Sequence, residues 1–471
     1  YNNMKQKQSL GYVIFMAVVA AIGGILFGYD TAVISGTTAI VKNQFQLTDM
    51  MEGWYVGCAL IGSICGVLVA GSLSDYLGRK LTMLISAALF SISAIGCAVC
   101  GSFDGLVAYR IIGGVGIGIV SIVSPIYISE VSPAKIRGTL VSLYQLAVTV
   151  GFLLAYLANW VIDSNIDTSL ALGDPNLSLW ERMMNTEAWR GMLGSETLPA
   201  LLFFLVIFFI PESPKWLILK GKMDKAATVL GKIYSQPQEV EAEITVTKDS
   251  LGGDKGSWAD LLKPGILLAV IVGSAIAILG QFMGVNAVLY YGPEIFKGAG
   301  LASDDALFYQ VIVGLANMIT TVLAMFIIDK IGRKKLIYYG VSGMIVSLLL
   351  IAAYFIWGEA LNISSYYLLV FFVLYIVCCA GSICAVVWVI LSEMYPIKVR
   401  AVAMSIASFA LWIGTFLIGQ LTPWLLTNIT PQGTFLLFAI CCIPYMLIMW
   451  KAVPETTGKS LEEIEKYWTK K

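Results

Sequence analysis

Apolar runs of about 20 residues, separated by shorter polar segments, recur along the whole chain. An α-helix of that length spans the hydrocarbon core of a bilayer, whereas a helix on the surface of a soluble protein has one polar face. The pattern predicts an all-α membrane protein with twelve transmembrane helices. We expect these helices at residues 11–35, 53–73, 81–102, 105–128, 139–163, 188–210, 264–292, 306–328, 335–357, 365–391, 401–427 and 431–452.

The composition supports membrane embedding and narrows the chemistry. Hydrophobic residues make up 58% of the 471 positions and charged residues only 13%, against roughly 25% charged in soluble domains. The 30 basic and 30 acidic residues cancel, so we expect no nucleic-acid partner. The absence of histidine removes the commonest metal ligand and the usual base near neutral pH. We therefore expect no metal, no cofactor and no enzymatic activity, and any proton chemistry must use carboxyl groups.

Three motifs occur twice, in the same order and at the same topological places. Their carboxylates and arginines can form ion pairs between the two halves of the chain that break when the halves rock. We therefore predict a role in conformational gating for Asp75, Arg79, Glu130, Arg137, Asp329, Arg333, Glu393 and Arg400. The motif pairs are Asp75–Lys80 and Asp329–Lys334, Ser129–Arg137 and Ser392–Arg400, and Pro211–Ser213 and Pro454–Thr456.

The repeats predict two pseudo-symmetric six-helix bundles with a substrate site between them, which is a transporter plan. The segment after Pro211 is the only long polar stretch, and Ser213 followed by Pro214 is typical of a helix start. We expect short intracellular helices there. The predicted parts are an N-terminal bundle (1–210), a cytoplasmic linker (211–263), a C-terminal bundle (264–453) and a cytoplasmic tail (454–471).

The distribution of the 30 Lys and Arg residues predicts the orientation, because cytoplasmic loops are enriched in these residues. With the N-terminus inside, most of them fall in cytoplasmic segments, and an even number of spans puts the C-terminus inside as well. We expect a monomeric, multi-pass protein of the plasma membrane, with the bacterial inner membrane as its location and the lipid bilayer as its surroundings.

The motifs together resemble the sugar porter branch of the major facilitator superfamily over essentially the whole chain. Within that branch the chain is most similar to the bacterial xylose–proton symporters, and it is also similar to animal glucose facilitators. The resemblance implies the major facilitator fold and alternating-access transport of a monosaccharide. The residues that carry it are Gly78–Lys80, Arg110, Gly113–Gly116, Glu130, Arg137, Pro211–Pro214, Gln281–Tyr291 and Pro454–Thr456.

Asp30, Arg110 and Glu196 lie inside predicted spans, where a charge costs roughly 2.5–3.5 kcal/mol on insertion scales. Asp30 lies about 28 Å along the first span at 1.5 Å per residue, and Arg110 lies near the start of a span that runs the other way. The two side chains can therefore meet, either as a proton-coupling site or as a static ion pair. The resemblance implies proton coupling, since the proton-coupled members carry Asp at the Asp30 position, and it assigns Glu196 to the same relay.

A sugar site needs amide side chains, which both donate and accept hydrogen bonds, and an aromatic platform. The predicted substrate-binding residues are Phe27, Gln145, Gln281, Asn286, Tyr290, Tyr291, Trp388 and Trp412. The glycines and the proline of span seven (Gly280, Gly284, Gly292 and Pro293) predict a broken gating helix.

Several positions depart from the family pattern, namely Gly280, Leu411, Phe152 and the pair Cys384-Ala385. These leave the pocket with fewer hydrogen-bonding partners, so xylose and related pentoses or hexoses all remain candidates. The sequence favours proton–sugar symport. A passive sugar facilitator is the main alternative, and a transporter-like sugar sensor is another, although the short tail argues against the sensor.

Overall fold

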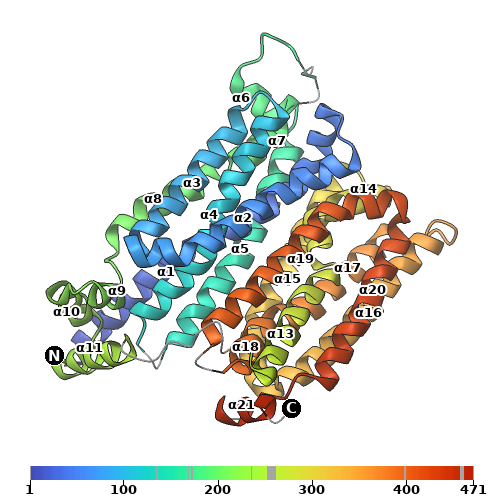
Figure 1. The fold of residues 1–471 in the computed structure, drawn as a ribbon. Helices are drawn as coiled ribbons and strands as arrows, with labels where there is room; N and C mark the ends of the chain where they lie inside the picture. The colour runs from blue at the N-terminus through green and yellow to red at the C-terminus, as the bar shows by residue number, and fades with distance from the viewer. Residues whose placement is uncertain are drawn as a thin grey trace. The chain divides into compact units, whose positions relative to one another are not determined.

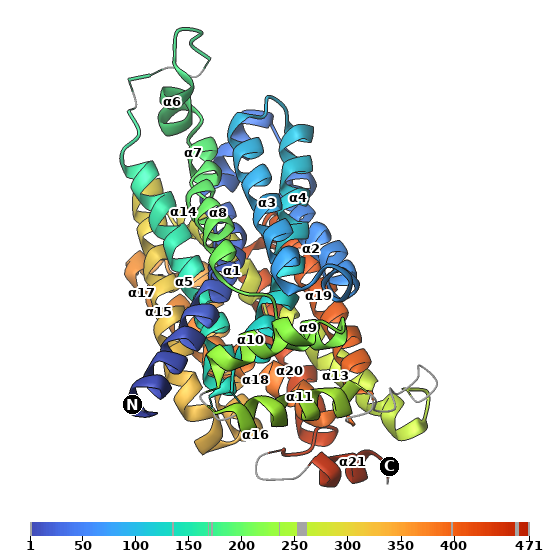
Figure 2. The same cartoon turned by 90° about the vertical axis from the view of Figure 1, so that its left-hand side faces the viewer.

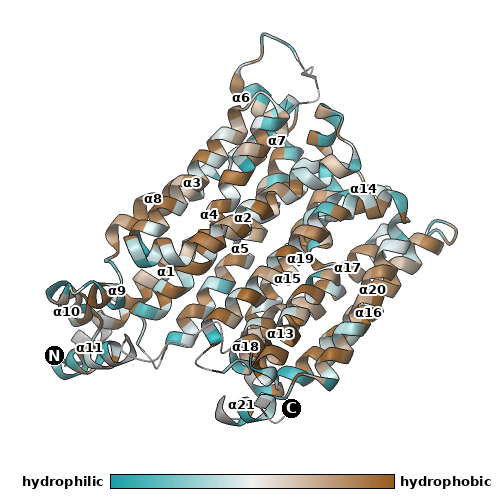
Figure 3. Cartoon of the chain, in the orientation of Figure 1, coloured by the Kyte–Doolittle hydropathy of each residue, from teal (hydrophilic) through white to brown (hydrophobic). Residues whose placement is uncertain are grey.

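The computed structural model describes residues 2–133, 136–167, 169–170, 173–234, 236–251, 261–396, 399–456 and 461–469. These residues fold into helices connected by turns and loops (Figure 1). Twelve of the helical segments are long and apolar enough to cross a membrane. The central parts of these helices are mostly hydrophobic, as Figure 3 shows. The twelve predicted spans are therefore confirmed.

Contacts between residues divide the chain into two compact units. The first consists of Tyr1–Val33, Ile61–Ala158 and Ser169–Asp254, and the second of Ile34–Leu60, Asn159–Thr168 and Lys255–Lys471. The C-terminal part of α1, the start of α2 and the end of α5 thus cluster with the second unit. The predicted domain limits at 210 and 264 remain a prediction.

The first unit contains two long helices entirely, α3 and α4, and the larger parts of α1, α2 and α5. Its sixth span is assembled from short pieces. The helices are α1 (Asn2–Phe45), α2 (Asp49–Leu77), α3 (Arg79–Val99), α4 (Phe103–Val131), α5 (Arg137–Ser164), α6 (Leu179–Glu181), a π-helical turn (Arg182–Thr186), α7 (Ala188–Gly194), α8 (Thr197–Val206), a 3₁₀ turn (Ile207–Phe209), α9 (Pro214–Leu219), α10 (Met223–Ile233) and α11 (Pro237–Leu251).

The second unit contains the remaining helices, of which two spans are each divided into two. The helices are α13 (Pro264–Phe282), α14 (Val285–Gly298), α15 (Ser303–Ile331), α16 (Arg333–Trp357), α17 (Ser365–Ala380), α18 (Ile383–Met394), α19 (Arg400–Asn428), α20 (Thr430–Lys451) and α21 (Leu461–Thr469).

The linker forms the short helices that the sequence predicts. Ser213 caps α9, because its hydroxyl accepts a hydrogen bond from the Trp216 N–H at 3.3 Å, and Pro214 occupies the first turn. Figures 1 and 2 show α9, α10 and α11 gathered at one end of the first unit, near the start of α1. There the Lys232 ammonium lies 5.7 Å from the centre of the Tyr12 ring.

Span seven is broken as predicted, and the break lies at one glycine. Gly284 separates α13 from α14 and has a φ of 92°, a left-handed conformation that glycine adopts without steric cost. Pro293, by contrast, lies inside α14. Span ten, which the sequence places at 365–391, is also interrupted, at Gly381-Ser382 between α17 and α18.

The first helix continues well beyond residue 35, where the sequence places its end. It reaches Phe45, and α2 begins at Asp49, earlier than the expected residue 53. The physical reason is the charge of Lys42, whose ammonium lies 2.9 Å from Asp49 Oδ1 and 2.6 Å from Glu52 Oε2. This pairing partly compensates the charge of a basic residue that lies in a membrane-spanning helix.

Each unit contains the same tight connection between two long helices, and a glycine makes it possible. Gly78 joins α2 to α3 with φ 99° and ψ 164°, and Gly332 joins α15 to α16 with φ 94° and ψ 153°. Only glycine adopts this conformation readily. A Cβ at position 78 would also lie 2.3 Å from Glu212 Oε2.

We therefore expect Gly78→Ala to destabilise the protein by roughly 1–3 kcal/mol through backbone strain, with a further loss from the displaced Glu212 side chain. Thermal unfolding of the purified protein in detergent measures the effect. Gly71→Ala is the matched control, because Gly71 lies in α2 with no neighbouring atom within 4 Å of its Cβ position. Equal unfolding temperatures for the two variants would contradict the strain argument.

Candidate functional site

Asp30 and Arg110 form a buried ion pair in the first unit, which confirms that they can meet. The Arg110 guanidinium donates a hydrogen bond to Asp30 Oδ1. Asp30 is 0% exposed and Arg110 is 3% exposed. The pair joins α1 to α4 inside their membrane-spanning parts, so water does not screen the attraction.

Gly113 makes room for this ion pair. It follows Arg110 by one turn of α4, on the same face of the helix. A Cβ at position 113 would lie 3.0 Å from Asp30 Oδ2 and 2.5 Å from Ser93 Oγ on α3. The glycine-rich segment after Arg110 therefore lets α1 and α3 pack closely against α4.

Glu196 is the third ionisable member of this group. It lies between α7 and α8, is 2% exposed, and interacts electrostatically with Asp30 and Arg110. Asp30 Oδ2 and Glu196 Oε1 are buried, and neither has a hydrogen-bonding partner among the described residues. With all three groups ionised, two carboxylates face one guanidinium, which leaves a net charge of −1.

Part of the predicted sugar site comes together in the second unit. Gln281, near the end of α13, accepts hydrogen bonds through Oε1 from Asn286 Nδ2 at 2.7 Å and from Thr415 Oγ1 at 3.1 Å. The break at Gly284 brings the two amides together, since Asn286 lies beyond it in the first turn of α14. Thr415 on α19 was not predicted, and a lone threonine in an apolar span gives no signal of its own.

The other predicted sugar-site residues are distributed over both units. Tyr290 and Tyr291 are buried in the second unit, where the Tyr291 hydroxyl donates to the Gly419 carbonyl at 2.6 Å. Trp412 is also buried, whereas Trp388 is exposed. The remaining two belong to the first unit, Phe27 half-buried and Gln145 exposed. A single cavity lined by both units remains a prediction.

The predicted gating residues of the first unit include a network around Arg79. Its guanidinium contacts both oxygens of Glu130, at 3.0 and 3.1 Å, and Asp75 Oδ1 at 3.0 Å. Glu130 also accepts a hydrogen bond from the Ser213 hydroxyl. Glu212 accepts from the backbone N–H groups of Arg79 and Lys80, at 2.9 and 3.2 Å.

Burial raises the pKa of the Glu212 carboxyl above its usual range. The backbone donors, which favour the ionised form, act in the opposite direction. The sequence indicates Glu212 only as part of the Pro211–Ser213 motif, and its hydrogen bonds show that it caps the start of α3.

The second unit repeats this network with its own residues. Arg333 donates to Glu393 at 3.0 Å, and Glu393 accepts from the Thr456 hydroxyl. Glu455 accepts from the Lys334 N–H at 3.2 Å. The side chain of Asp329 lies outside the described residues.

Arg137 and Arg400, the last two predicted gating residues, make equivalent hydrogen bonds in the two units, because each donates to the carbonyl of the residue five positions earlier. Arg137 bonds to the Ser132 carbonyl at 3.4 Å and Arg400 to the Tyr395 carbonyl at 3.2 Å. The sequence repeat is thus a repeat of hydrogen-bonding patterns, each closed within its own unit. Pairing between the two halves remains a prediction.

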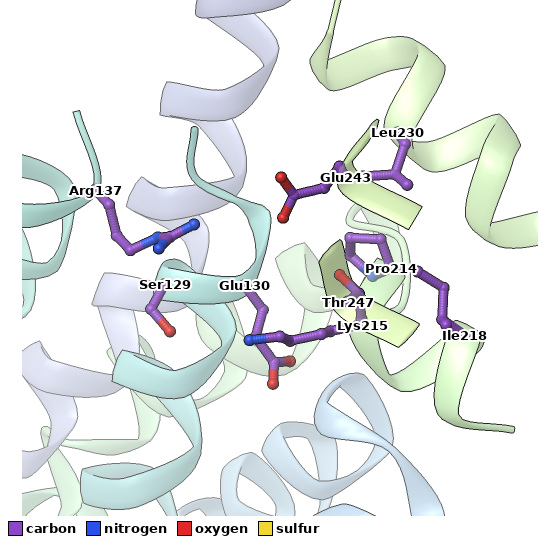
Figure 4. Close-up of a pocket in the computed structure, with 9 residues that line it drawn as sticks. All are labelled: Ser129, Glu130, Arg137, Pro214, Lys215, Ile218, Leu230, Glu243 and Thr247. Carbon is purple, nitrogen blue, oxygen red and sulfur yellow. The ribbon is translucent and has the colours of Figure 1, made fainter. Parts of the chain in front are cut away.

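A small cavity adjoins the network of the first unit. It is lined by residues at the end of α4, at the start of α5 and in the linker helices, including Glu130, Arg137, Lys215 and Thr247. Figure 4 shows the Lys215 ammonium extending toward Glu130. The cavity has a volume of about 20 Å³, room for roughly one water molecule. It is too small for a sugar.

Comparisons with known proteins agree with this architecture. The family model "Sugar (and other) transporter" matches residues 16–468. The arabinose-proton symporter of Bacillus subtilis is 38% identical over 466 residues, covering 99% of this chain and 97% of the relative. The D-xylose-proton symporter of Escherichia coli is 36% identical over 497 residues, with the same coverage. The inward-open structure of the E. coli xylose transporter XylE superposes with a TM-score of 0.84 at 34% identity, covering 97% of this chain and all of that one.

The chain therefore belongs to the sugar transporter family, the sugar porter branch of the major facilitator superfamily. It is a multi-pass membrane transporter and not an enzyme, as predicted from its composition.

Because Gln281 is the acceptor that links Asn286 to Thr415, we expect Gln281→Ala to weaken sugar binding several-fold. Losing one hydrogen bond to the sugar costs a net binding free energy of about 0.5–1.5 kcal/mol, which corresponds to a several-fold lower affinity. Isothermal titration with the transported sugar measures the affinity. Gln432→Ala, in the first turn of α20, is the control and should bind normally. An unchanged affinity in Gln281→Ala would remove Gln281 from the sugar site.

Proposed function

We propose that the protein is a proton–monosaccharide symporter, with Asp30 as the proton-binding group and Arg110 as its switchable partner. The observation that supports it is the buried group of two carboxyls and one guanidinium in the first unit, in which Asp30 Oδ2 and Glu196 Oε1 lack partners among the described residues. The named relatives include an arabinose-proton and a D-xylose-proton symporter.

The charge balance of this group explains why a proton is the coupling ion. With all three members ionised the group carries a charge of −1, and an uncompensated charge is costly in a membrane interior. One proton makes the group neutral and gives one carboxyl a hydrogen to donate. The second carboxyl, Glu196, therefore makes proton binding by this group favourable, and Arg110 keeps an ionised carboxylate nearby when Asp30 takes up the proton.

Transport follows if the Asp30–Arg110 contact differs between the two access states. Separating Arg110 from an ionised Asp30 leaves two opposite charges buried and unpaired, which is unfavourable. A protonated Asp30 loses that attraction, so the helices α1 and α4 can move apart more easily. Proton binding then biases the conformational equilibrium, as any ligand does that prefers one state.

A pentose or a related hexose is the substrate class that fits the residues. Gln281, Asn286 and Thr415 supply donors and acceptors for hydroxyl groups, and the aromatic residues supply surfaces for the apolar faces of a sugar ring. Counterflow in proteoliposomes against arabinose, xylose and glucose tests the class. Failure of every pentose and hexose to exchange would contradict it.

The proposal also includes the orientation of the protein in the membrane and its cellular location. Both termini are placed in the cytoplasm by the positive-inside rule, and the bacterial relatives support a bacterial plasma membrane. A C-terminal green fluorescent protein should fluoresce, whereas a C-terminal alkaline phosphatase should be inactive. The reverse pattern would overturn the orientation.

The symporter hypothesis predicts that Asp30→Asn abolishes uphill uptake driven by a pH gradient. The amide is isosteric with the protonated carboxyl, so sugar binding and counterflow should largely survive. Active accumulation, binding and counterflow are measured on the same variant in proteoliposomes. Asp104→Asn is the matched control, because Asp104 lies in the first turn of α4 and is exposed, and it should accumulate sugar normally.

Two other outcomes for Asp30→Asn would contradict the assignment. Persistent accumulation would show that Asp30 is not the coupling group, and Glu196→Gln would then be tested in the same assays. A misfolded variant without sugar binding would indicate a static ion pair, since removing one partner of a buried pair costs about 3–5 kcal/mol. Accumulation that is absent even in the unmodified protein, with intact counterflow, would indicate a passive facilitator.

A further inference from the structure

A second group of buried ionisable residues lies in the second unit, at the end of α1 that is remote from the N-terminus. Lys42 is twelve residues beyond Asp30, about 18 Å along the helix at 1.5 Å per residue. Glu52 lies in the first turn of α2 and Glu294 on the second half of α14. The proposed sugar and proton sites use none of these residues.

Glu52 is the most deeply buried member of this group. The residue is 0% exposed, and its Oε2 lies 2.6 Å from the Lys42 ammonium. The Glu294 carboxyl is within hydrogen-bonding reach of the Glu52 carboxyl. Oε1 of Glu52 and Oε1 of Glu294 are both buried, and neither accepts a hydrogen bond from a donor among the described residues.

Asp49 adds another negative charge to this group, but its carboxylate has hydrogen-bond donors and some contact with solvent. Its carboxylate accepts hydrogen bonds from Lys42, at 2.9 Å, and from Thr427, and it is partly exposed to solvent. With every group ionised, three carboxylates would face one ammonium, for a net charge of −2.

The other titratable groups that face the pair do not supply a positive charge. Tyr291 lies close enough to interact electrostatically with both carboxyls, and Tyr290 and Cys58 lie near Tyr291. All three are neutral near pH 7. Lys297, the next cation on α14, lies near Asp163.

Two ionised carboxylates in contact are mutually repulsive, and both are hydrogen-bond acceptors only. One shared proton changes this, because it turns one of them into a donor and halves the excess charge. We propose that Glu52 and Glu294 form a second proton-binding site of this transporter, distinct from Asp30, Arg110 and Glu196. The proton is held while the start of α2 is packed on α14 and α19.

The packing around the pair explains how this proton is coupled to conformation. The Gln420 amide of α19 donates to the Met50 carbonyl at 2.8 Å, and a Cβ at Gly53 would lie 2.0 Å from the Gln420 carbonyl oxygen. Glu52 therefore stays away from water only while α2 remains against α19. Separation of these helices hydrates both carboxyls and releases the shared proton, so closure of this end takes up a proton.

The test uses infrared spectroscopy of the full-length protein, reconstituted without sugar. In an Asp30→Asn/Glu196→Gln background, the carboxyls of the other site are absent. We expect a protonated-carboxyl band at neutral pH that disappears when Glu294→Gln is added. Adding Asp104→Asn instead should leave the band unchanged. A missing band in the background protein, or a band that survives Glu294→Gln, would overturn the proposal.

A second readout keeps the proposal falsifiable if one variant folds poorly. The packed state binds a proton that the unfolded chain releases above the ordinary pKa of a glutamate, about 4.3. The ratio of folded to unfolded protein should therefore fall about tenfold per pH unit from there up to the pH at which the packed pair itself loses the proton, and level off beyond it. Glu52→Gln and Glu294→Gln each replace a carboxyl by an amide, which donates a hydrogen bond but does not titrate. In each variant the thermal midpoint should therefore depend less on pH. A slope that matches the unmodified protein in both variants would contradict the site.

Discussion

An ionised side chain inside a bilayer must find a partner within the protein, and this requirement determines which helices of the transporter meet. A lone charge at the centre of a span costs roughly 2.5–3.5 kcal/mol on insertion scales. Arg110 is therefore held against Asp30, which joins α4 to α1. In the second unit Lys42 holds the end of α1 against the start of α2 through Asp49 and Glu52. Carboxyl groups outnumber cations in both groups, and the proton binding that we propose reduces this imbalance of charge.

The same constraint acts at the helix ends, where backbone groups need partners. Glu212 accepts from the first N–H groups of α3, and Glu455 accepts from Lys334 at the start of α16. A carboxylate in that place also interacts favourably with the positive end of the helix dipole. The recurrence of Pro-Glu-Ser and Pro-Glu-Thr thus has a physical cause, because each supplies a cap for a helix that begins directly after a glycine in a conformation restricted to glycine.

The sequence was sufficient to predict features that depend on local pattern. The twelve spans follow from hydropathy, and the meeting of Asp30 with Arg110 follows from helix rise and direction. Features that depend on packing were missed. Glu52 sits at the edge of an apolar run and has the appearance of an interfacial residue, although its side chain is 1% exposed. Thr415 and the break at Gly381-Ser382 gave no periodic signal, since their roles arise from contacts between residues distant in sequence.

Three residues of the candidate sites lie next to interruptions of the spans, and this has a physical basis. A break leaves backbone groups without helical partners, which a membrane tolerates only where protein or water surrounds them. Glu196 lies between α7 and α8, and Gln281 and Asn286 lie on either side of Gly284. An interruption also turns the chain, so that side chains a few positions apart can face one another, as the hydrogen bond between these two amides shows. An uninterrupted helix would place residues 281 and 286 about 140° apart around its axis at 3.6 residues per turn. The glycine at 284 is therefore as much a part of the candidate sugar site as the amides it brings together.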